Sequence, residues 1–193
     1  MLFKPLIIRN KMADKEQLLE ILKEKSLMRG DFILASGKKS TYYIDGKKTT
    51  FDPEGAYLTG HLLLDEIIKL DTQVDAVGGM SIGADPIVTA IGLAARERGI
   101  PLRIFITRKK AKDHGTQRTI EGNFQSGDNV VMVEDVMTTG GSTLQAVDIV
   151  REAGGNVLAA LVIVDREQGG EENLADVGIR LTSLFSIQIL LAE

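Results

Sequence analysis

Two adjacent acidic residues, Glu134 and Asp135, stand where an apolar run meets a turn of small polar residues, and we call them the acid pair. The stretch reads VVMVEDVMTTGGSTL over residues 130–144. Its apolar part is typical of a buried strand, and the pattern after the turn is typical of a helix. Backbone N–H groups at a helix N-terminus attract anions, glycines let the backbone approach a ligand, and hydroxyls add donors. Residues 138–142 therefore suit a phosphate group.

The acid pair needs a different ligand, because two carboxylates repel a phosphate. Sugar hydroxyls, or a divalent metal beside the phosphate, would accommodate both acids. A structural alternative is that Asp135 caps the turn while the threonines and the serine cap the helix. The spacing alone leaves these interpretations open. The turn is not a Walker A loop, because it lacks the GxxxxGK[ST] pattern.

A second group of residues suited to chemistry lies in the segment TRKKAKDHGTQRTIEGNFQ, residues 107–125. A loop of this length inside a compact domain is usually functional or disordered. Gly115 and Gly122 suit hinges, and closure over an anion would exclude water and supply positive charge. A solvated run of charges is the alternative. Five of the chain's 23 lysines and arginines lie here, namely Arg108, Lys109, Lys110, Lys112 and Arg118.

The composition narrows the class of protein. The 193 residues suffice for one domain with a sizeable core, and the lack of cysteine excludes disulfides and thiolate metal sites. The longest apolar run, residues 157–164, is too short to span a bilayer, and the N-terminal residues make a poor signal peptide. The net charge of -4 argues against bulk nucleic-acid binding. We therefore expect a cytoplasmic protein with no membrane and no nucleic-acid partner.

Strands and helices alternate along most of the chain and must position these groups. Residues 14–25 suit an amphipathic helix, and residues 30–55 suit irregular strands and turns. Asp52 and Pro53 then look like the N-cap and first position of a helix that reaches about residue 70. Short apolar strands alternate with glycine-terminated helices beyond it, which indicates an α/β fold with a mostly parallel sheet flanked by helices. Ligands bind such sheets at the carboxyl ends of the strands, where the acid pair stands.

Four segments resemble motifs of the type I phosphoribosyltransferases. VVMVEDVMTTGGSTLQAV, residues 130–147, is similar to their motif for binding phosphoribosyl pyrophosphate (PRPP). FILASGKKSTYYID (residues 32–45), RKKAKDHG (108–115) and VDR (164–166) are similar to the N-terminal motif, the catalytic loop and an orotate-contacting segment of the orotate phosphoribosyltransferases. These motifs follow one another in the expected order over most of the chain, which is thereby identified as a member of that family.

The resemblance implies a type I phosphoribosyltransferase fold in a single domain over residues 1–193. A core with a mostly parallel sheet is expected over about residues 54–178. A small hood is expected from about residues 1–50 together with the C-terminal end. The resemblance also implies a homodimer with shared active sites, in which the loop of one subunit closes over the site of the other.

The implied reaction transfers the 5-phosphoribosyl group from PRPP to orotate. It gives orotidine 5′-phosphate and pyrophosphate, in de novo pyrimidine (UMP) biosynthesis. Positive charge grows on the ribose and negative charge on the leaving group, so the site needs acids near the ribose and cations around the pyrophosphate. Mg²⁺ is the implied cofactor, held mainly by the substrate and water rather than by protein ligands.

The resemblance also implies roles for individual residues. Lys112 and Asp135 are implied to be catalytic, and the acid pair is implied to contact the ribose hydroxyls directly or through metal-bound water. The implied PRPP-binding residues are Arg108, Lys109, Lys112, His114, Glu134, Asp135, Val136, Met137, Thr138, Thr139, Gly140, Gly141 and Ser142. The implied orotate-binding residues are Thr138, Arg166, Tyr43 and Ile44.

Three positions depart from the family pattern. Ala35 and Ile82 stand where many members carry a lysine, and Lys110 stands where they often carry an acid. We expect backbone N–H groups around residues 81–84 to take over part of the lost contacts. Two other functions stay open at this point. One is a phosphoribosyltransferase for another base, which should lack KDHG and Arg166, and the other is a non-catalytic regulator that senses PRPP and binds nucleic acid.

Overall fold

The computed structural model describes residues 11–33, 39–109 and 119–192, and its main sheet has six strands in the order β5-β4-β3-β6-β7-β8. β5 runs antiparallel to β4, and every other neighbouring pair is parallel. This mostly parallel sheet agrees with the alternation of strands and helices in the sequence. The strands are β3 (Ala76–Gly78), β4 (Arg103–Thr107), β5 (Ile120–Gly122), β6 (Asn129–Met137), β7 (Asn156–Asp165) and β8 (Arg180–Ser186).

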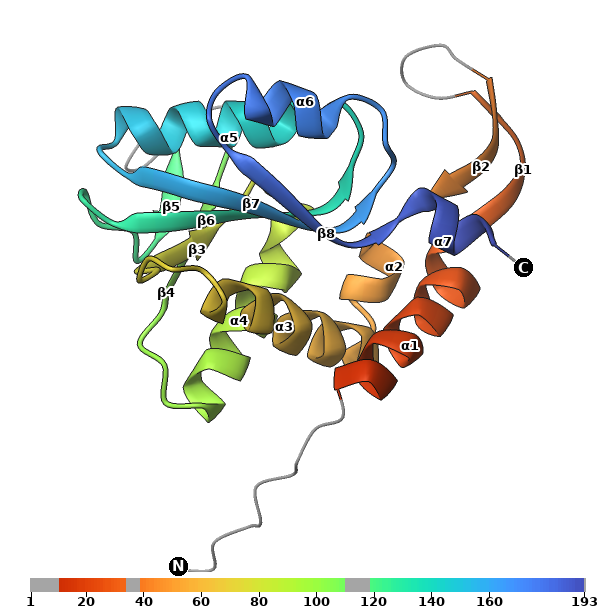
Figure 1. The fold of residues 1–193 in the computed structure, drawn as a ribbon, viewed down its shortest axis with the longest axis horizontal. Coiled ribbons are helices and arrows are strands. Elements are labelled where there is room, and N and C mark those ends of the chain that lie inside the picture. Colours follow the sequence, from red (N-terminus) through yellow and green to blue (C-terminus); the bar gives the residue numbers. More distant parts are fainter. Residues whose placement is uncertain (1–10, 34–38, 110–118, 193) are drawn as a thin grey trace, which may run out of the picture.

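Helices cover both faces of this sheet (Figure 1). Two of them, α3 (Pro53–Ile68) and α4 (Ala84–Glu97), lie on one face, whereas α5 (Gly141–Glu152) and α6 (Gly170–Ala175) lie on the other. Each face buries its own apolar cluster. None of the helices in the described ranges has both the length and the apolar composition that a membrane span requires.

The position of β7 between β6 and β8 explains why its sequence is apolar without interruption. Leu161 and Ile163 enter the cluster under α3 and α4, whereas Ala160 and Val162 enter the cluster under α5. Successive side chains of a strand point to opposite faces, so a strand covered on both sides needs apolar residues at every position. β7 is therefore buried on both faces, as a strand of a sheet flanked by helices should be.

Local sequence sets where two helices begin. Asp52 caps α3, since its Oδ1 accepts a hydrogen bond from the Gly55 N–H at 2.9 Å, and Pro53 occupies the first helical position. Gly140 precedes α5 with a φ of 78°, a left-handed conformation that glycine adopts at little cost. Because β6 ends at residue 137, this tight turn brings the N-terminus of α5 to the carboxyl end of β6.

A smaller layer, which we call the hood, packs beside one end of the sheet (Figure 1). Arg29 Nη2 donates to the Leu191 carbonyl at 3.2 Å, and Lys23 Nζ donates to the Ala192 carbonyl at 2.5 Å, so the C-terminal end is fastened to the N-terminal region. The helix that the sequence predicted over residues 14–25 begins at residue 11, and a π-helical turn replaces its last residues. The hood contains α1 (Lys11–Ile21), the π-helical turn (Leu22–Ser26), the hairpin of β1 (Leu27–Ile33) and β2 (Lys39–Ile44), α2 (Lys47–Thr50) and α7 (Ile187–Leu191).

Candidate active site

The acid pair lies near the carboxyl end of β6, and each of its side chains is only 9% exposed. The strand continues past the pair to residue 137, because Met137 still pairs with Asp165 of β7. Thr143 Oγ1 donates to Glu134 Oε2 at 3.4 Å, and the Val136 N–H donates to Asp135 Oδ1 at 2.9 Å. The two carboxylates are therefore held in place by the strand and by the first turn of α5.

A cavity of about 240 Å³ joins the acid pair to the turn before α5. A carboxylate pair, threonine and serine hydroxyls and the N-terminus of a helix meet in it, a set of groups that suits a sugar phosphate. Thr139 is the one residue of the predicted turn that does not line it. The lining residues are Glu134, Asp135, Val136, Met137, Thr138, Gly140, Gly141, Ser142 and Thr143.

The short helix α6 supports this turn from behind. Asn173 Nδ2 donates to the carbonyl of Thr139 at 2.8 Å. A Cβ atom added at Gly170 would lie 2.8 Å from the Thr138 carbonyl oxygen, so only glycine allows this approach. The sequence contained no signal for this support, because each residue lies more than thirty positions from the threonine that it contacts.

Backbone from two other loops contacts the acid pair. A Cβ atom at Gly83, just before α4, would lie 2.8 Å from Glu134 Oε1 and 2.9 Å from Asp135 Oδ1. From the hood, a Cβ atom at Gly46 would lie 2.8 Å from Asp135 Oδ2. The acid pair is thus enclosed by the loop after β3 on one side and the turn after β2 on the other.

This enclosure changes the acidity of the pair. Burial, and then the charge of neighbouring Asp135, raise the pKa of Glu134 to about 8. A proton held at Glu134 near neutral pH relieves the repulsion between two carboxylates that share one site. Before substrate binds, the acid pair therefore carries less negative charge than two isolated carboxylates would.

Replacing Glu134 with glutamine is expected to flatten the pH dependence of stability. A carboxyl whose folded-state pKa is raised binds its proton more tightly in the folded state, so its stabilising effect is full below the unfolded-state pKa and is lost as pH rises through about 8. Between roughly pH 5 and 8, the unfolding free energy of the ligand-free wild type should fall relative to that of Glu134→Gln by about 1.4 kcal/mol per pH unit. Urea unfolding at several pH values measures this difference. A constant difference across that range would contradict the raised pKa.

Arg166 directly follows β7 and is 8% exposed. Its backbone N–H donates to the carbonyl of Met137 at 2.9 Å, which places the residue beside the cavity of the acid pair. Its Nε and Nη2 atoms are buried and have no hydrogen-bond partner within the described parts of the chain. Burying a cation without a partner costs free energy, so an anionic ligand would stabilise this guanidinium. A carboxylate matches its geometry.

The two hood residues predicted to contact the base lie on opposite faces of β2. Tyr43 is 39% exposed and its ring centroid lies 5.8 Å from that of Phe32, whereas Ile44 is buried in the core. The ring that lies against Arg166 belongs to Tyr42, with 5.1 Å between the guanidinium carbon and the ring centroid. Sequence reasoning missed Tyr42, although the two-residue period of a strand places it on the same face as Ile44.

The predicted basic loop is described only at its two ends. The Arg108 N–H donates to the Thr119 carbonyl at 2.9 Å, and Arg108 Nε lies 3.7 Å from Glu121 Oε1 on β5. Lys109 is exposed. The remaining predicted residues of this loop, Lys112 and His114, lie outside the described residues, as do Ala35 and Lys110.

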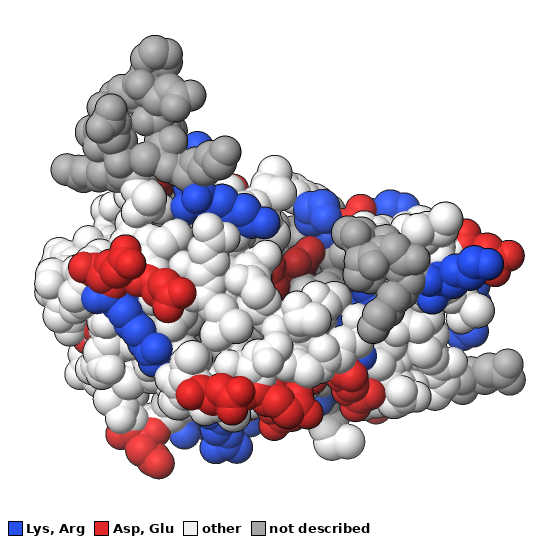
Figure 2. All heavy atoms as spheres, turned by 90° about the horizontal axis from the view of Figure 1, so that it is seen from above, with Lys and Arg blue, Asp and Glu red and all other residues white. Residues whose placement is uncertain are grey.

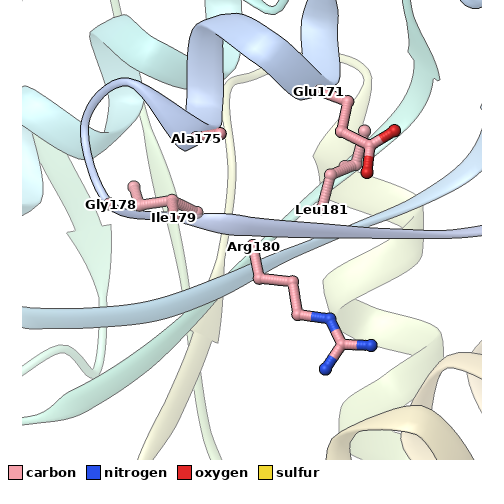
Figure 3. A pocket seen from close by; sticks show the side chains of 6 residues that line it. All are labelled: Glu171, Ala175, Gly178, Ile179, Arg180 and Leu181. Carbon is pink, nitrogen blue, oxygen red and sulfur yellow. The ribbon is translucent and has the colours of Figure 1, made fainter.

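A second cavity, of about 330 Å³, lies between α6 and β8. Figure 3 shows its two charged residues, Glu171 and Arg180, on opposite sides of the β8 ribbon rather than converging on one point. A binding site for a polar ligand needs convergent groups. The charged residues of this second cavity therefore do not converge as the acid pair does.

Comparisons with known proteins agree with this geometry. The family model described as "Phosphoribosyl transferase domain" matches residues 66–188. The orotate phosphoribosyltransferase of Aquifex aeolicus is 45% identical over 183 residues, covering 93% of this chain and 99% of that relative. The orotate phosphoribosyltransferase of Methanocaldococcus jannaschii is 46% identical over 180 residues, covering 93% of this chain and 98% of that relative.

A solved structure is similar in the same way. The crystal structure of Mycobacterium tuberculosis orotate phosphoribosyltransferase in complex with PRPP has a TM-score of 0.77 and 34% sequence identity, and the match covers 92% of this chain and 98% of that one. The matches to the family model, to the two relatives and to the solved structure all include the acid pair, the turn before α5 and Arg166. The chain therefore belongs to the orotate phosphoribosyltransferases, within the wider phosphoribosyltransferase family.

Proposed function

We propose that this chain transfers the 5-phosphoribosyl group from PRPP to orotate, and forms orotidine 5′-phosphate and pyrophosphate. This reaction is a step of de novo pyrimidine biosynthesis, on the way to UMP. The observation that carries the proposal is the buried guanidinium of Arg166 beside the cavity of the acid pair, with two nitrogens that have no hydrogen-bond partner among the described residues. A base with a carboxylate, such as orotate, supplies the anion that this guanidinium lacks.

The reaction breaks the bond between the anomeric carbon of ribose and a pyrophosphate oxygen. Positive charge develops on the ribose, and the carboxylate of Asp135 stabilises it electrostatically. The acid pair binds the ribose hydroxyls, and residues 138–142 bind the 5′-phosphate at the N-terminus of α5. Negative charge develops on the leaving pyrophosphate, where Arg108, Lys109, Lys112 and His114 supply positive charge.

The donor atoms of this site suit magnesium. The cavity offers carboxylate and hydroxyl oxygens, which are the ligands that hard divalent cations prefer. Among the described residues, no three histidine, cysteine, aspartate or glutamate side chains gather to hold a metal ion. Held mainly by the substrate and water, magnesium would neutralise charge on the pyrophosphate. The acid pair orients the ribose beside it.

The proposal includes a homodimer with two shared sites, located in the cytoplasm. A twofold interface is isologous, so a loop that reaches the partner creates two equivalent composite sites. A chain without cysteine fits a reducing compartment, which supports the cytoplasmic assignment.

A nucleic-acid-binding regulator would need a basic surface for phosphate contacts. The net charge of the chain is -4. Figure 2 shows acidic and basic side chains interspersed over the face that it presents, with acidic groups along its lower edge. The charge distribution on this face therefore favours an enzyme over the regulator.

A spectrophotometric assay tests the proposed function. Orotate absorbance is followed with purified protein and magnesium, with and without PRPP. Orotate should disappear only when PRPP is present, and a metal chelator should abolish the loss. Adenine, hypoxanthine and uracil in place of orotate test the alternative of another base. No PRPP-dependent loss of orotate, or faster use of another base, would contradict the proposal.

Replacing Arg166 with alanine should raise the KM for orotate far more than the KM for PRPP. Loss of a buried contact to an anion costs at least about 2 kcal/mol, which corresponds to roughly a thirtyfold rise in KM. Arg180→Ala is the matched control, because Arg180 is an exposed arginine at the start of the neighbouring strand β8 (Figure 3). Initial rates over a grid of both substrate concentrations separate the two constants. Equal rises in both constants would mean that Arg166 supports the fold or the phosphate instead.

A further inference from the structure

The guanidinium of Arg166 lies over an aromatic ring, and no acidic side chain pairs with it among the residues that the structure describes. Its central carbon lies 5.1 Å from the ring centroid of Tyr42. A cation over an aromatic face is attracted by the electron-rich ring. This attraction uses no N–H group, and Nε and Nη2 of Arg166 are indeed buried without a hydrogen-bond partner in the part of the chain that the structure describes.

The adjacent acid in the chain is engaged elsewhere. Asp165, which precedes Arg166, is 8% exposed, and its Oδ1 accepts a hydrogen bond from the Glu167 N–H at 2.9 Å. A carboxylate paired with Arg166 would neutralise the guanidinium and occupy its donors. The ring of Tyr42 does neither, so it leaves the positive charge and the two N–H groups without a partner in the described part of the chain.

The hood hairpin is shaped to place this ring. Arg29 of β1 pairs with Tyr42, and Phe32 pairs with Ser40, so Gly30 and Asp31 together oppose the single residue between them on β2. Such a bulge bends a strand and changes the direction of nearby side chains. Gly30 has a φ of 151°, which glycine tolerates better than other residues.

A serine fixes the backbone of the same residue. Ser40 Oγ donates to the Tyr42 carbonyl at 2.7 Å and accepts from the Tyr42 N–H at 3.3 Å. The ring itself is half-buried and packs against the main apolar cluster. Tyr42 is thus constrained by the bulge, by Ser40 and by the core.

We propose that Tyr42 is a positioning residue for the base: its ring holds Arg166 so that Nε and Nη2 meet the carboxylate of orotate. This inference rests on the proposed function and adds to it a hood residue that determines specificity. It couples the hood to the core, because the ring comes from β2 and the guanidinium from the end of β7. Without the ring, the guanidinium can rotate away and the carboxylate loses its oriented donors.

Two substitutions at this position separate the ring from the hydroxyl. Tyr42→Phe keeps the aromatic face, so both KM values should stay within about twofold of the wild type. Tyr42→Leu removes the face, so the KM for orotate should rise about tenfold while the KM for PRPP changes less than about twofold. Tyr57→Leu is the control, because it removes a tyrosine of α3 whose ring lies against His61 and which does not line the cavity of the acid pair. Thermal melting verifies that each variant is folded.

The outcomes distinguish this inference from the proposed function. If the wild type shows no PRPP-dependent use of orotate, the proposed function fails and this inference fails with it. If the wild type is active but Tyr42→Leu leaves the KM for orotate unchanged, raises both KM values equally, or behaves as Tyr42→Phe does, only the inference on Tyr42 is overturned. If Tyr42→Leu is unfolded at the assay temperature, Tyr42→Met takes its place, because methionine has an unbranched side chain and no ring. The same rise in the KM for orotate is expected of it, and an unchanged KM would overturn the inference.

Discussion

Replacing Asp135 with asparagine is expected to lower kcat by about a hundredfold to a thousandfold while the protein stays folded. The fold should survive because asparagine is nearly isosteric, and its Oδ1 can still accept the hydrogen bond that the Val136 N–H donates at 2.9 Å. Turnover should fall because the substitution removes negative charge next to the ribose, where positive charge develops. Steady-state kinetics at saturating orotate and PRPP, together with circular dichroism, measure both effects.

The neighbouring acid provides a sharp contrast to this variant. Because the pKa of Glu134 is raised to about 8, the ligand-free enzyme already carries a proton there near pH 7, and Glu134→Gln removes little charge. We therefore expect a smaller loss of kcat for Glu134→Gln than for Asp135→Asn at that pH. Asp148→Asn, on an exposed position of α5, is the charge-matched control and should be fully active. Near-normal turnover of a folded Asp135→Asn variant would show that Asp135 has no such role.

Much of the core could be predicted because its sequence signals are local. The apolar run of β7, the cap and proline at the start of α3, and the glycine before α5 each act over a few residues. The cavity of the acid pair was predictable for the same reason. All its lining residues come from one continuous segment, and the carboxyl-end rule for parallel sheets places that segment at a ligand site.

The surroundings of the site were not predictable, because they depend on residues distant in the chain. Gly83 and Gly46 contact the acid pair from two different loops, and Asn173 holds the turn from α6. Nothing in the sequence near these residues indicates what they touch. Tyr42 was a different kind of omission. Its strand was interpreted as irregular, so the alternation that places Tyr42 and Tyr43 on opposite faces was not applied.

The proposed sharing of sites between subunits makes a second prediction with a large effect. Lys112→Ala and Asp135→Asn homodimers should each be nearly inactive, because every site lacks one catalytic residue. In a mixed dimer, one site combines the intact Asp135 of the first subunit with the intact Lys112 of the second, while the other site lacks both residues. Each heterodimer should therefore have roughly half of the wild-type rate, as twofold symmetry requires.

Co-refolding an equal mixture of the two variants tests this arrangement. Random pairing makes about half of all dimers heterodimers, so the mixture should regain roughly a quarter of wild-type activity. A loop that serves its own subunit gives two defective sites in every heterodimer. An inactive mixture, beside a wild-type control that refolds with full activity, would therefore disprove the shared site while leaving the reaction itself in place.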